Sequence, residues 1–351
     1  MIALLLAAAL APTAMAADRI EAEQLTGGRV VRDASASGGR ALQLPREQTV
    51  RTVVQTAAPT SVRVRVRASG CTGRVRTGGR ARRVTRGGWR IVTVPLAAGS
   101  STVSLRRLGA CAVRVDRLDV IFNPAPTTTW QWQLTGPLDL SVPAELYDVD
   151  LFDTSAETVE RIHAQGARAV CYFSAGTRER GRPDPFPASV AGKALEDYPD
   201  ERWLDVRALD VLAPIVERRL DLCARKGFDG AEADNVDAYA NDSGFPLRAA
   251  DQLRFNRFLA RAAHARGLSI GLKNDLDQVK ALEPAFDWAL NEQCFQYEEC
   301  DRLRPFTAAG KAVFVAEYEL APSVFCAQAR AAGLMAMRKR LDLDAVREPC
   351  W

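Results

Sequence analysis

The 351-residue chain has only two histidines, His163 and His264. Both fall within runs whose apolar residues recur at helical spacing, so we expect them on a helix surface or in packing. This scarcity excludes most Ser-His-Asp and Cys-His machinery, and no G-x-S-x-G motif is present. It also argues against a zinc hydrolase, whose site generally needs two or three histidines. No C-x-x-C motif offers an alternative zinc site.

Beyond its first residues the sequence lacks any apolar run of about 18 residues, so we expect no membrane insertion. Residues 1–16, MIALLLAAALAPTAMA, form a shorter apolar run that ends in the small-x-small pattern Ala14-Met15-Ala16. Such a run is typical of a secretory signal peptide. The sequence therefore predicts a secreted or periplasmic protein.

The eight cysteines fit an oxidising compartment, where an even number favours disulfides. Their positions along the chain favour the pairs Cys71–Cys111, Cys294–Cys300 and Cys326–Cys350. Cys171 lies on an apolar strand and Cys223 in a helical run. These two could pair with each other or remain buried thiols.

Residues 1–120 contain no lysine. They carry 20 arginines and seven acidic residues, a net charge of +13, whereas residues 121–351 carry 27 basic and 36 acidic residues, a net charge of −9. Such a shift predicts two domains. We expect a β-sandwich over residues 17–122, a linker over 123–129 and a second domain over 130–351.

The first domain is predicted to be all-β because residues 62–67 alternate valine and arginine with the period of a strand. The arginines could form a solvated strand face or contact an anionic surface. No aromatic interleaving accompanies them, so we do not expect nucleic-acid binding. The domain resembles β-sandwich carbohydrate-binding modules at its two ends, which implies Glu21, Glu23 and Asp116 as candidate ligands of a structural calcium.

From residue 130 onward, short apolar runs alternate with helical or loop segments. Three helical segments, 156–165, 213–226 and 249–266, are followed by Gly166, Gly227 and Gly267 as expected C-caps. The eight strands predicted are 130–134, 147–152, 169–174, 228–232, 269–273, 288–291, 312–316 and 334–337. This alternation predicts parallel strands in an α/β fold, a (β/α)8 TIM barrel. A doubly wound sheet is the alternative, although no G-x-G-x-x-G turn follows an early strand.

In a TIM barrel the active site lies at the carboxyl ends of the strands. Acids and amides crowd the predicted strand ends, for example Asp150, Asp234, Asn235, Glu292 and Glu317. Any one of them could cap a helix or be a solvated loop residue. With histidine chemistry excluded, paired carboxylates remain as acid, base or nucleophile, which is the apparatus of glycosidic cleavage. A carboxylate site for magnesium or calcium is the other option for these acids.

Several sequence blocks resemble glycoside hydrolase family 114, in order along residues 130–320. They are AVCYFSAG (169–176), RPD (182–184), ERWLD (201–205), GFDGAEADNVD (227–237), GFP (244–246), GLKND (271–275), NEQCFQY (291–297) and EY (317–318). The resemblance implies a TIM-barrel endo-α-1,4-polygalactosaminidase, which cuts polymers rich in α-1,4-linked galactosamine, and no cofactor. It also implies that the catalytic pair is Asp234 and Glu292. The basic N-terminal domain lies outside this resemblance.

We expect Asp234 to be the nucleophile and Glu292 the acid/base, in a retaining mechanism, with the reverse assignment as the alternative. Lys273 would keep Asp234 ionised, and partial burial would favour a protonated Glu292. Galactosamine without acetylation is cationic, so the acidic second domain would attract its polymer. The expected substrate-binding residues are Asp150, Tyr172, Glu232, Asn235, Asp237, Lys273, Asn291 and Glu317.

Two other functions stay open at this point. The chain could be a glycosidase for neutral or N-acetylated glycans, or a surface protein that binds polysaccharide without cleaving it.

Overall fold

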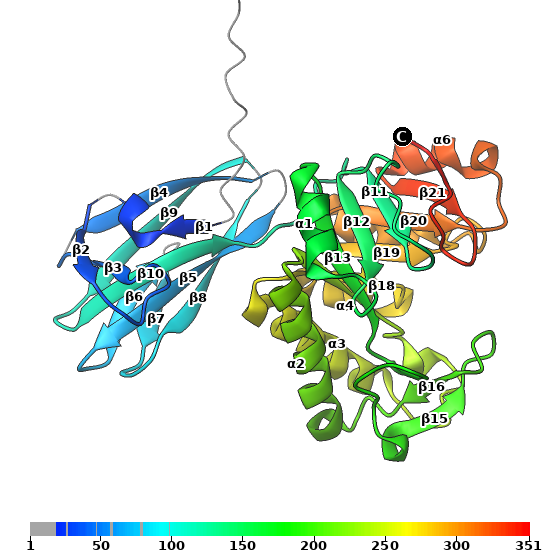
Figure 1. Cartoon of the computed structure of the whole chain (residues 1–351), viewed down its shortest axis with the longest axis horizontal. Coiled ribbons are helices and arrows are strands. Elements are labelled where there is room, and N and C mark those ends of the chain that lie inside the picture. The colour runs from blue at the N-terminus through cyan, green and yellow to red at the C-terminus, as the bar shows by residue number, and fades with distance from the viewer. Residues whose placement is uncertain (1–18, 26, 47, 57–58, 78–79, 98) are drawn as a thin grey trace, which may run out of the picture. The chain divides into compact units, whose positions relative to one another are not determined.

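The computed structural model describes residues 19–351 except 26, 47, 57–58, 78–79 and 98 (Figure 1). The predicted signal peptide lies outside these residues. The described chain divides into two compact units. An N-terminal unit comprises residues up to 56 together with 64–92 and 100–120, and a C-terminal unit comprises 57–63, 93–99 and 121–351.

The first part of the chain forms two sheets whose described strand pairs are antiparallel. One sheet has the order β2-β3-β10-β5-β8, with β1 paired to β10, and the other has the order β4-β9-β6-β7. The strands are β1 (Arg19–Glu21), β2 (Arg29–Arg32), β3 (Arg40–Gln43), β4 (Thr49–Thr56), β5 (Thr60–Ser69), β6 (Gly73–Thr77), β7 (Arg80–Val84), β8 (Arg90–Leu96), β9 (Gly99–Leu108) and β10 (Ala112–Val120). A short 3-10 helix, η1 (Ala22–Gln24), follows β1.

Strand β5 shows why the valine–arginine alternation folds in this way. Val64 and Val66 are fully buried, while Arg65 and Arg67 lie on the opposite face. Arg65 forms an ion pair with Asp116, and Arg67 forms one with Asp33. These two arginines are therefore neutralised by aspartates of their own unit.

The expected calcium site is not supported by the surroundings of its three candidate ligands. The Asp116 carboxylate is fully buried, and its positive partners are the guanidinium groups of Arg65 and Arg117. Glu21 accepts a hydrogen bond from Ser37 Oγ at 3.0 Å, and Glu23 is exposed. Among the described residues, no group of three or more His, Cys, Asp or Glu side chains could hold a metal ion.

The C-terminal unit contains a sheet of nine strands, in which the first eight follow the chain order and pair in parallel. The ninth, β22, is antiparallel to β21. The strands are β11 (Trp130–Gln133), β12 (Leu146–Asp150), β13 (Arg168–Ser174), β17 (Gly230–Asp234), β18 (Ser269–Lys273), β19 (Trp288–Glu292), β20 (Val313–Glu317), β21 (Met335–Lys339) and β22 (Arg347–Pro349).

The sheet curls until its first strand approaches its eighth. Trp130 Nε1 donates to Met335 O at 2.8 Å, and Leu134 N donates to Leu343 O at 2.9 Å. Alternate residues of the strands point into the space so enclosed, where Trp130 packs on Phe314 with ring centroids 4.8 Å apart. This unit is therefore a mixed α/β structure with a nearly closed sheet.

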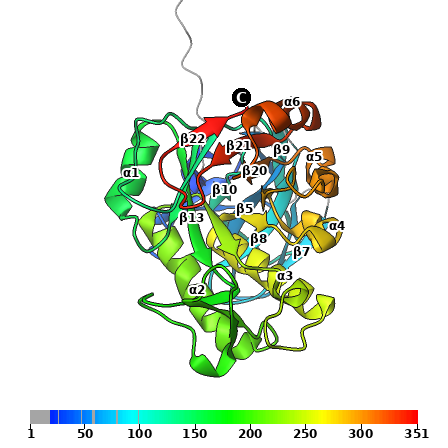
Figure 2. The same ribbon diagram turned by 90° about the vertical axis from the view of Figure 1, so that its right-hand side faces the viewer.

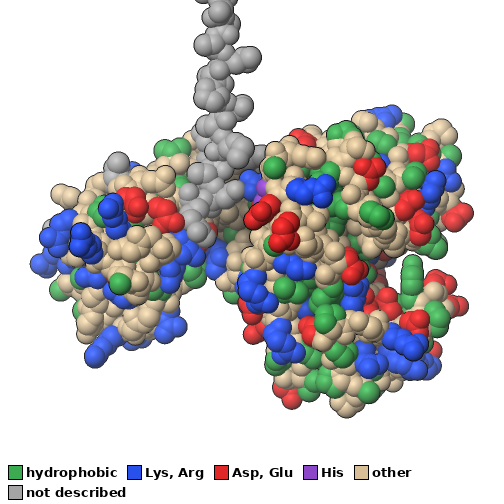
Figure 3. All heavy atoms as spheres, viewed as in Figure 1, with side chains coloured by type: hydrophobic (Ala, Val, Ile, Leu, Met, Phe, Trp, Pro, Cys, Tyr) green, Lys and Arg blue, Asp and Glu red, His purple; other side chains and the backbone are tan. Residues whose placement is uncertain are grey.

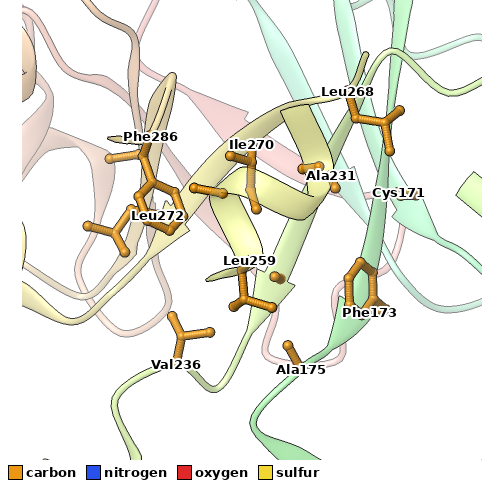
Figure 4. Packing of buried hydrophobic residues seen from close by; sticks show 14 of the residues in the cluster. Cys171, Phe173, Ala175, Ala231, Val236, Leu259, Leu268, Ile270, Leu272 and Phe286 are labelled. Atoms are coloured by element: carbon orange, nitrogen blue, oxygen red, sulfur yellow. The ribbon is translucent and has the colours of Figure 1, made fainter. Parts of the chain in front are cut away.

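The other face of the sheet packs against helices that surround it (Figure 2). Phe173, Ala231 and Ile270 from neighbouring strands meet Leu259 of a covering helix (Figure 4). The helices are α1 (Ala156–Ala164), α2 (Leu209–Lys226), α3 (Ala249–Arg266), α4 (Val279–Leu282), α5 (Arg304–Ala308) and α6 (Pro322–Ala332). No helix of the described chain is long and apolar enough to cross a membrane.

The expectation of eight strand–helix repeats is met only in part. Residues 134–145, between β11 and β12, contain no helix, and α4 and α5 have only four and five residues. A small antiparallel sheet precedes α2; it contains β14 (Thr177–Glu179), β15 (Ala191–Ala194) and β16 (Glu201–Leu204). Further 3-10 helices in this unit are η2 (Ala188–Val190), η3 (Ala238–Ala240), η4 (Leu276–Gln278), η5 (Glu283–Ala285) and η6 (Cys300–Leu303).

All eight cysteines form disulfides. The three predicted pairs, Cys71–Cys111, Cys294–Cys300 and Cys326–Cys350, are confirmed. The pairing that the sequence left open is Cys171–Cys223, which ties β13 to α2 with both cysteines fully buried.

Candidate active site

Three neighbouring strands end at the charged side chains of the site. Asp234, Lys273 and Glu292 are the last residues of β17, β18 and β19. The residue after each is in the left-handed region, with φ of 59° at Asn235, 47° at Asn274 and 61° at Gln293. This conformation is uncommon for side chains other than glycine, although asparagine tolerates it best. Each strand therefore stops abruptly, which leaves its last side chain at the same edge of the sheet.

Lys273 lies between the two predicted catalytic carboxylates. Its Nζ is 2.9 Å from Asp234 Oδ1 and 2.9 Å from Glu292 Oε2. Only 3% of its side chain is exposed, and burial alone would lower its pKa. The charges of Asp234 and Glu292 nevertheless raise the pKa of Lys273 well above its usual value, so it remains a cation.

Asp234 and Glu292 have closely matched hydrogen bonds. The second donor to Asp234 Oδ1 is the backbone N–H of Asn235 at 2.7 Å, and Tyr172 OH donates to Oδ2 at 2.9 Å. Asn274 Nδ2 donates to Glu292 Oε2 at 3.1 Å, and the hydroxyl of Tyr318 bonds Oε1. The side chain of Asp234 is 14% exposed and that of Glu292 is 25% exposed. Both carboxylates are held in place and both reach solvent.

A second carboxyl pair lies beneath Lys273. Asp148 of β12 and Glu232 of β17 are fully buried, and each carboxyl interacts electrostatically with the other. Glu232 Oε1 is 3.6 Å from Lys273 Nζ. Burial raises the pKa of Asp148 to about 7 and that of Glu232 well above its usual value. Two carboxylates this close cannot both ionise readily, because the negative charge of each disfavours ionisation of the other.

A cavity of about 360 Å³ opens above these groups. Its floor contains Asp234, Lys273 and Glu292, and two segments outside the strand ends supply walls. One is the β15–β16 segment, with Tyr198, Glu201 and Trp203, and the other is the β21–β22 loop, with Leu341, Asp342 and Leu343. A second cavity of about 300 Å³ shares Asp237, Asn274 and Glu292 with the first. The two form a cleft on both sides of Glu292.

The cleft is acidic. Burial raises the pKa of Glu201 to about 7 and that of Asp237 to about 6. Asp275, Asp277 and Glu299 add further carboxyl groups around the second cavity. A bound cation would relieve the repulsion among these groups and favour their ionised forms.

The residues expected to bind substrate fall into two groups. Tyr172, Asn235, Asp237, Lys273 and Asn291 line the cleft. The other three do not. Glu232 is fully buried; Asp150 is 5% exposed and paired with Arg182; and Glu317 is fully buried and accepts from Phe295 N. None of these three side chains lines either cavity of the cleft.

Several residues of the site were not predicted. Tyr318 and Asn274 follow predicted strands, and their hydrogen bonds to Glu292 would require knowledge of side-chain direction. Asp148 alternates with Tyr147 and Val149, so strand period alone could have placed it on the inner face. Glu201 and Trp203 sit on a short insertion whose sequence carries no regular apolar period. The family block ERWLD (201–205) was the one sequence signal for them, and it did not indicate that they line the cleft.

The site so described is a cleft with two carboxylates at the carboxyl ends of parallel strands, the arrangement used to hydrolyse glycosidic bonds. Two solved structures resemble the C-terminal part of the chain. Ega3 of Aspergillus fumigatus, crystallised in complex with galactosamine, is 40% identical with a TM-score of 0.63, over 65% of this chain and 97% of that one. The glycoside hydrolase domain of PelA from Pseudomonas aeruginosa is 15% identical with a TM-score of 0.51, over 62% and 97%, and bears on the fold alone.

The protein is a glycoside hydrolase. The model of glycoside-hydrolase family GH114 matches residues 115–351, and the chain belongs to that family. No curated protein sequence matches the chain.

Proposed function

We propose that this enzyme hydrolyses α-1,4-linked galactosamine-rich polysaccharide with retention of anomeric configuration. The observation that carries the mechanism is the position of Lys273 Nζ, 2.9 Å from Asp234 Oδ1 and 2.9 Å from Glu292 Oε2. Because each oxygen is 2.9 Å from the same nitrogen atom, the two carboxylate oxygens are at most 5.8 Å apart. Retaining enzymes place their carboxyl groups about 5–5.5 Å apart, whereas inverting enzymes need about 6.5 Å or more to admit a water.

In the proposed reaction Asp234 attacks the anomeric carbon while Glu292 protonates the leaving oxygen. Water then cleaves the glycosyl–Asp234 bond and gives its proton to Glu292. The two carboxylates have similar hydrogen-bond donors, so these contacts do not distinguish the nucleophile from the acid/base. The assignment of these roles rests on family resemblance and on the greater exposure of Glu292, because the acid/base must contact both the leaving group and water. Lys273 and Tyr172 would hold Asp234 ionised and oriented.

The substrate class follows from the charge of the cleft. Glu201, Asp237 and Asp275 lie around it, and the amino groups of unacetylated galactosamine are cationic. Tyr198 and Trp203 provide aromatic surface for sugar rings. The complex of Ega3 with galactosamine supports the same sugar as ligand.

Three further assignments belong to the proposal. The nearly closed sheet is interpreted as a modified (β/α)8 barrel over residues 130–351, reached through a linker at 123–129. The preceding all-β unit is interpreted as a β-sandwich over residues 17–122. The four disulfides support an exported protein, secreted or periplasmic, because such bonds persist in oxidising compartments.

The test of this function is digestion of a defined α-1,4-galactosamine oligomer. Mass spectrometry identifies the products, and NMR gives the configuration of the newly formed anomeric centre. We expect α-configured products from the wild type. Asp234→Asn and Glu292→Gln should lower kcat by about 10²–10⁴-fold. Asp153→Asn is the matched control, because this acid lies just after a strand of the same sheet, β12, but its side chain is 80% exposed.

Azide distinguishes the two roles. It should restore turnover of Glu292→Ala with an α-glycosyl azide product, and of Asp234→Ala with a β-glycosyl azide product. Interchanged products would reverse the assignment.

Full activity in both amide variants would overturn the catalytic pair, and binding without any product from the wild type would favour a non-catalytic polysaccharide-binding protein. Faster cleavage of the N-acetylated oligomer would favour a neutral-glycan hydrolase.

A further inference from the structure

The sheet β4-β9-β6-β7 of the N-terminal unit has an outer face that is rich in arginine. In each strand the buried residues, such as Val75 and Leu105, alternate with exposed ones. These four strands contain no aspartate or glutamate. The outward arginines are Arg51 on β4, Arg74 and Arg76 on β6, Arg83 on β7 and Arg106 on β9; we call this set the arginine face.

Strand register places these charges directly opposite each other. Arg74 pairs with Arg83 across β6 and β7, and Arg76 pairs with Arg106 across β6 and β9. Directly opposed side chains on one sheet face have Cβ atoms about 4.5–5.5 Å apart, and like charges there are destabilising. The fold therefore holds four arginines together at a cost to its own stability.

On the other sheet of the same unit, four arginines form ion pairs with aspartates. Arg65 and Arg117 contact Asp116, while Arg67 and Arg114 contact Asp33. Within the described residues, no member of the arginine face has an ion pair. Figure 3 shows how widely Lys and Arg side chains cover the visible side of this unit. Four arginines of the other sheet are thus neutralised, whereas, among the described residues, the five of the arginine face are not.

We propose that the arginine face binds a linear polysaccharide that carries carboxylate groups, a polyuronate. Guanidinium groups bind carboxylates through paired hydrogen bonds. Thr102 and Ser104 lie on the same face of β9 and offer hydroxyls to sugar rings. The four strands contain no Phe, Tyr or Trp, whereas single-stranded nucleic acid is bound by stacking aromatics. Duplex DNA is read by a helix or a ribbon inserted in a groove, which a broad sheet face does not provide.

This binding would be independent of the proposed hydrolysis, because a polyanion is not the cationic substrate of the acidic cleft. The arginine face lies in residues 51–106, outside the segment that matches the hydrolase family. Its consequence would be to retain the enzyme on an anionic matrix while the catalytic unit acts on a different polymer.

The test uses the full chain and measures retention on immobilised polygalacturonate as NaCl is raised. A variant with Arg74, Arg76, Arg83 and Arg106 all changed to Gln should bind at least tenfold more weakly. The matched control changes Arg218, Arg225, Arg261 and Arg304 to Gln, which removes the same charge from exposed positions of the C-terminal unit. We expect less than threefold loss in this control.

Three results would overturn the proposal: equal loss in both quadruple variants, equal binding to neutral dextran, or tighter binding of the wild type to duplex DNA than to polygalacturonate at the same salt. The last would assign the face to nucleic acid. Thermal unfolding excludes misfolding as the cause of lost binding, because removal of opposed like charges should leave Tm unchanged or raise it. Hydrolytic activity on a soluble oligomer should be unchanged in both variants.

Discussion

The buried carboxyl pair of Asp148 and Glu232 has no solvent to stabilise its charge. The four carboxylate oxygens of this pair accept no hydrogen bond from the described residues, and Lys273 Nζ lies 3.6 Å from Glu232 Oε1. Protonation of one carboxyl keeps one negative charge out of the interior. It also leaves Lys273 free to interact chiefly with Asp234 and Glu292.

This pair predicts how stability depends on pH. Burial raises the pKa of Asp148 from 3.8 to about 7 in the folded state. The folded state therefore binds more protons than the unfolded state between these values. The resulting stabilisation is complete below the unfolded pKa and is lost as pH rises to about 7. Each pH unit in that window costs up to about 1.4 kcal/mol.

We expect Asp148→Asn to make the fall in Tm between pH 4 and pH 7 shallower than in the wild type. Asp139→Asn is the control, because a hydrogen bond from Ser141 lowers the pKa of Asp139, the opposite direction. Thermal unfolding by circular dichroism at four or five pH values gives the slopes. Parallel curves for the wild type and Asp148→Asn would show that the pair does not retain its proton on folding.

At the scale of elements, the disulfide between β13 and α2 constrains the largest loop of the C-terminal unit. Cys171 and Cys223 are 52 residues apart, whereas Cys294 and Cys300 are six apart. In the chain-entropy account, a crosslink stabilises by restricting the unfolded chain, and the effect grows with the logarithm of loop length.

Replacing both cysteines of the long loop by alanine should therefore destabilise the protein by about 2 kcal/mol more than the same change in the short loop. Urea unfolding without reductant measures both losses, and the two variants serve as controls for each other. Equal destabilisation would mean that packing or native-state strain, rather than loop length, governs these crosslinks.

The elements best predicted from sequence are those with strong local signals. Strand β18 and helix α3 have the predicted bounds. Strand β18 is a short apolar run that ends at Lys273. Helix α3 has regular apolar spacing and is followed by Gly267. The small sheet β14-β16-β15 was not predicted, because its strands are only three or four residues long. The Cys171–Cys223 pair required the three-dimensional path of the chain.

The candidate site, like the fold, was predicted only where the sequence carries a strong local signal. Strand ends and the family blocks identified Asp234, Lys273 and Glu292, because parallel strands bring their carboxyl ends to one edge. Glu232, Asp150 and Glu317 were predicted to bind substrate, but none of them lines the cleft, because sequence alone does not tell which strand-end acids lie below or behind it. Side-chain depth depends on how the sheet curls.

At the scale of the whole molecule, the two parts of the chain carry opposite charge. Residues 1–120 have a net charge of +13 and residues 121–351 a net charge of −9. A protein with the same sign of charge throughout would attract only polymers of the opposite sign. This partition instead lets each part respond to a polymer of opposite sign, with ionic strength weakening both interactions.

For the proposed substrate, kcat/KM on unacetylated galactosamine polymer should fall by about tenfold or more between 0.05 M and 0.5 M NaCl. Most of the change should be in KM, because salt screens the attraction between the acidic cleft and the amino groups rather than the buried contacts of Lys273. Initial rates on the polymer measure this effect, and a short N-acetylated oligomer, which is neutral, serves as the control. If the control loses activity to the same degree, salt acts on the enzyme itself, and electrostatic attraction does not select the cationic polymer.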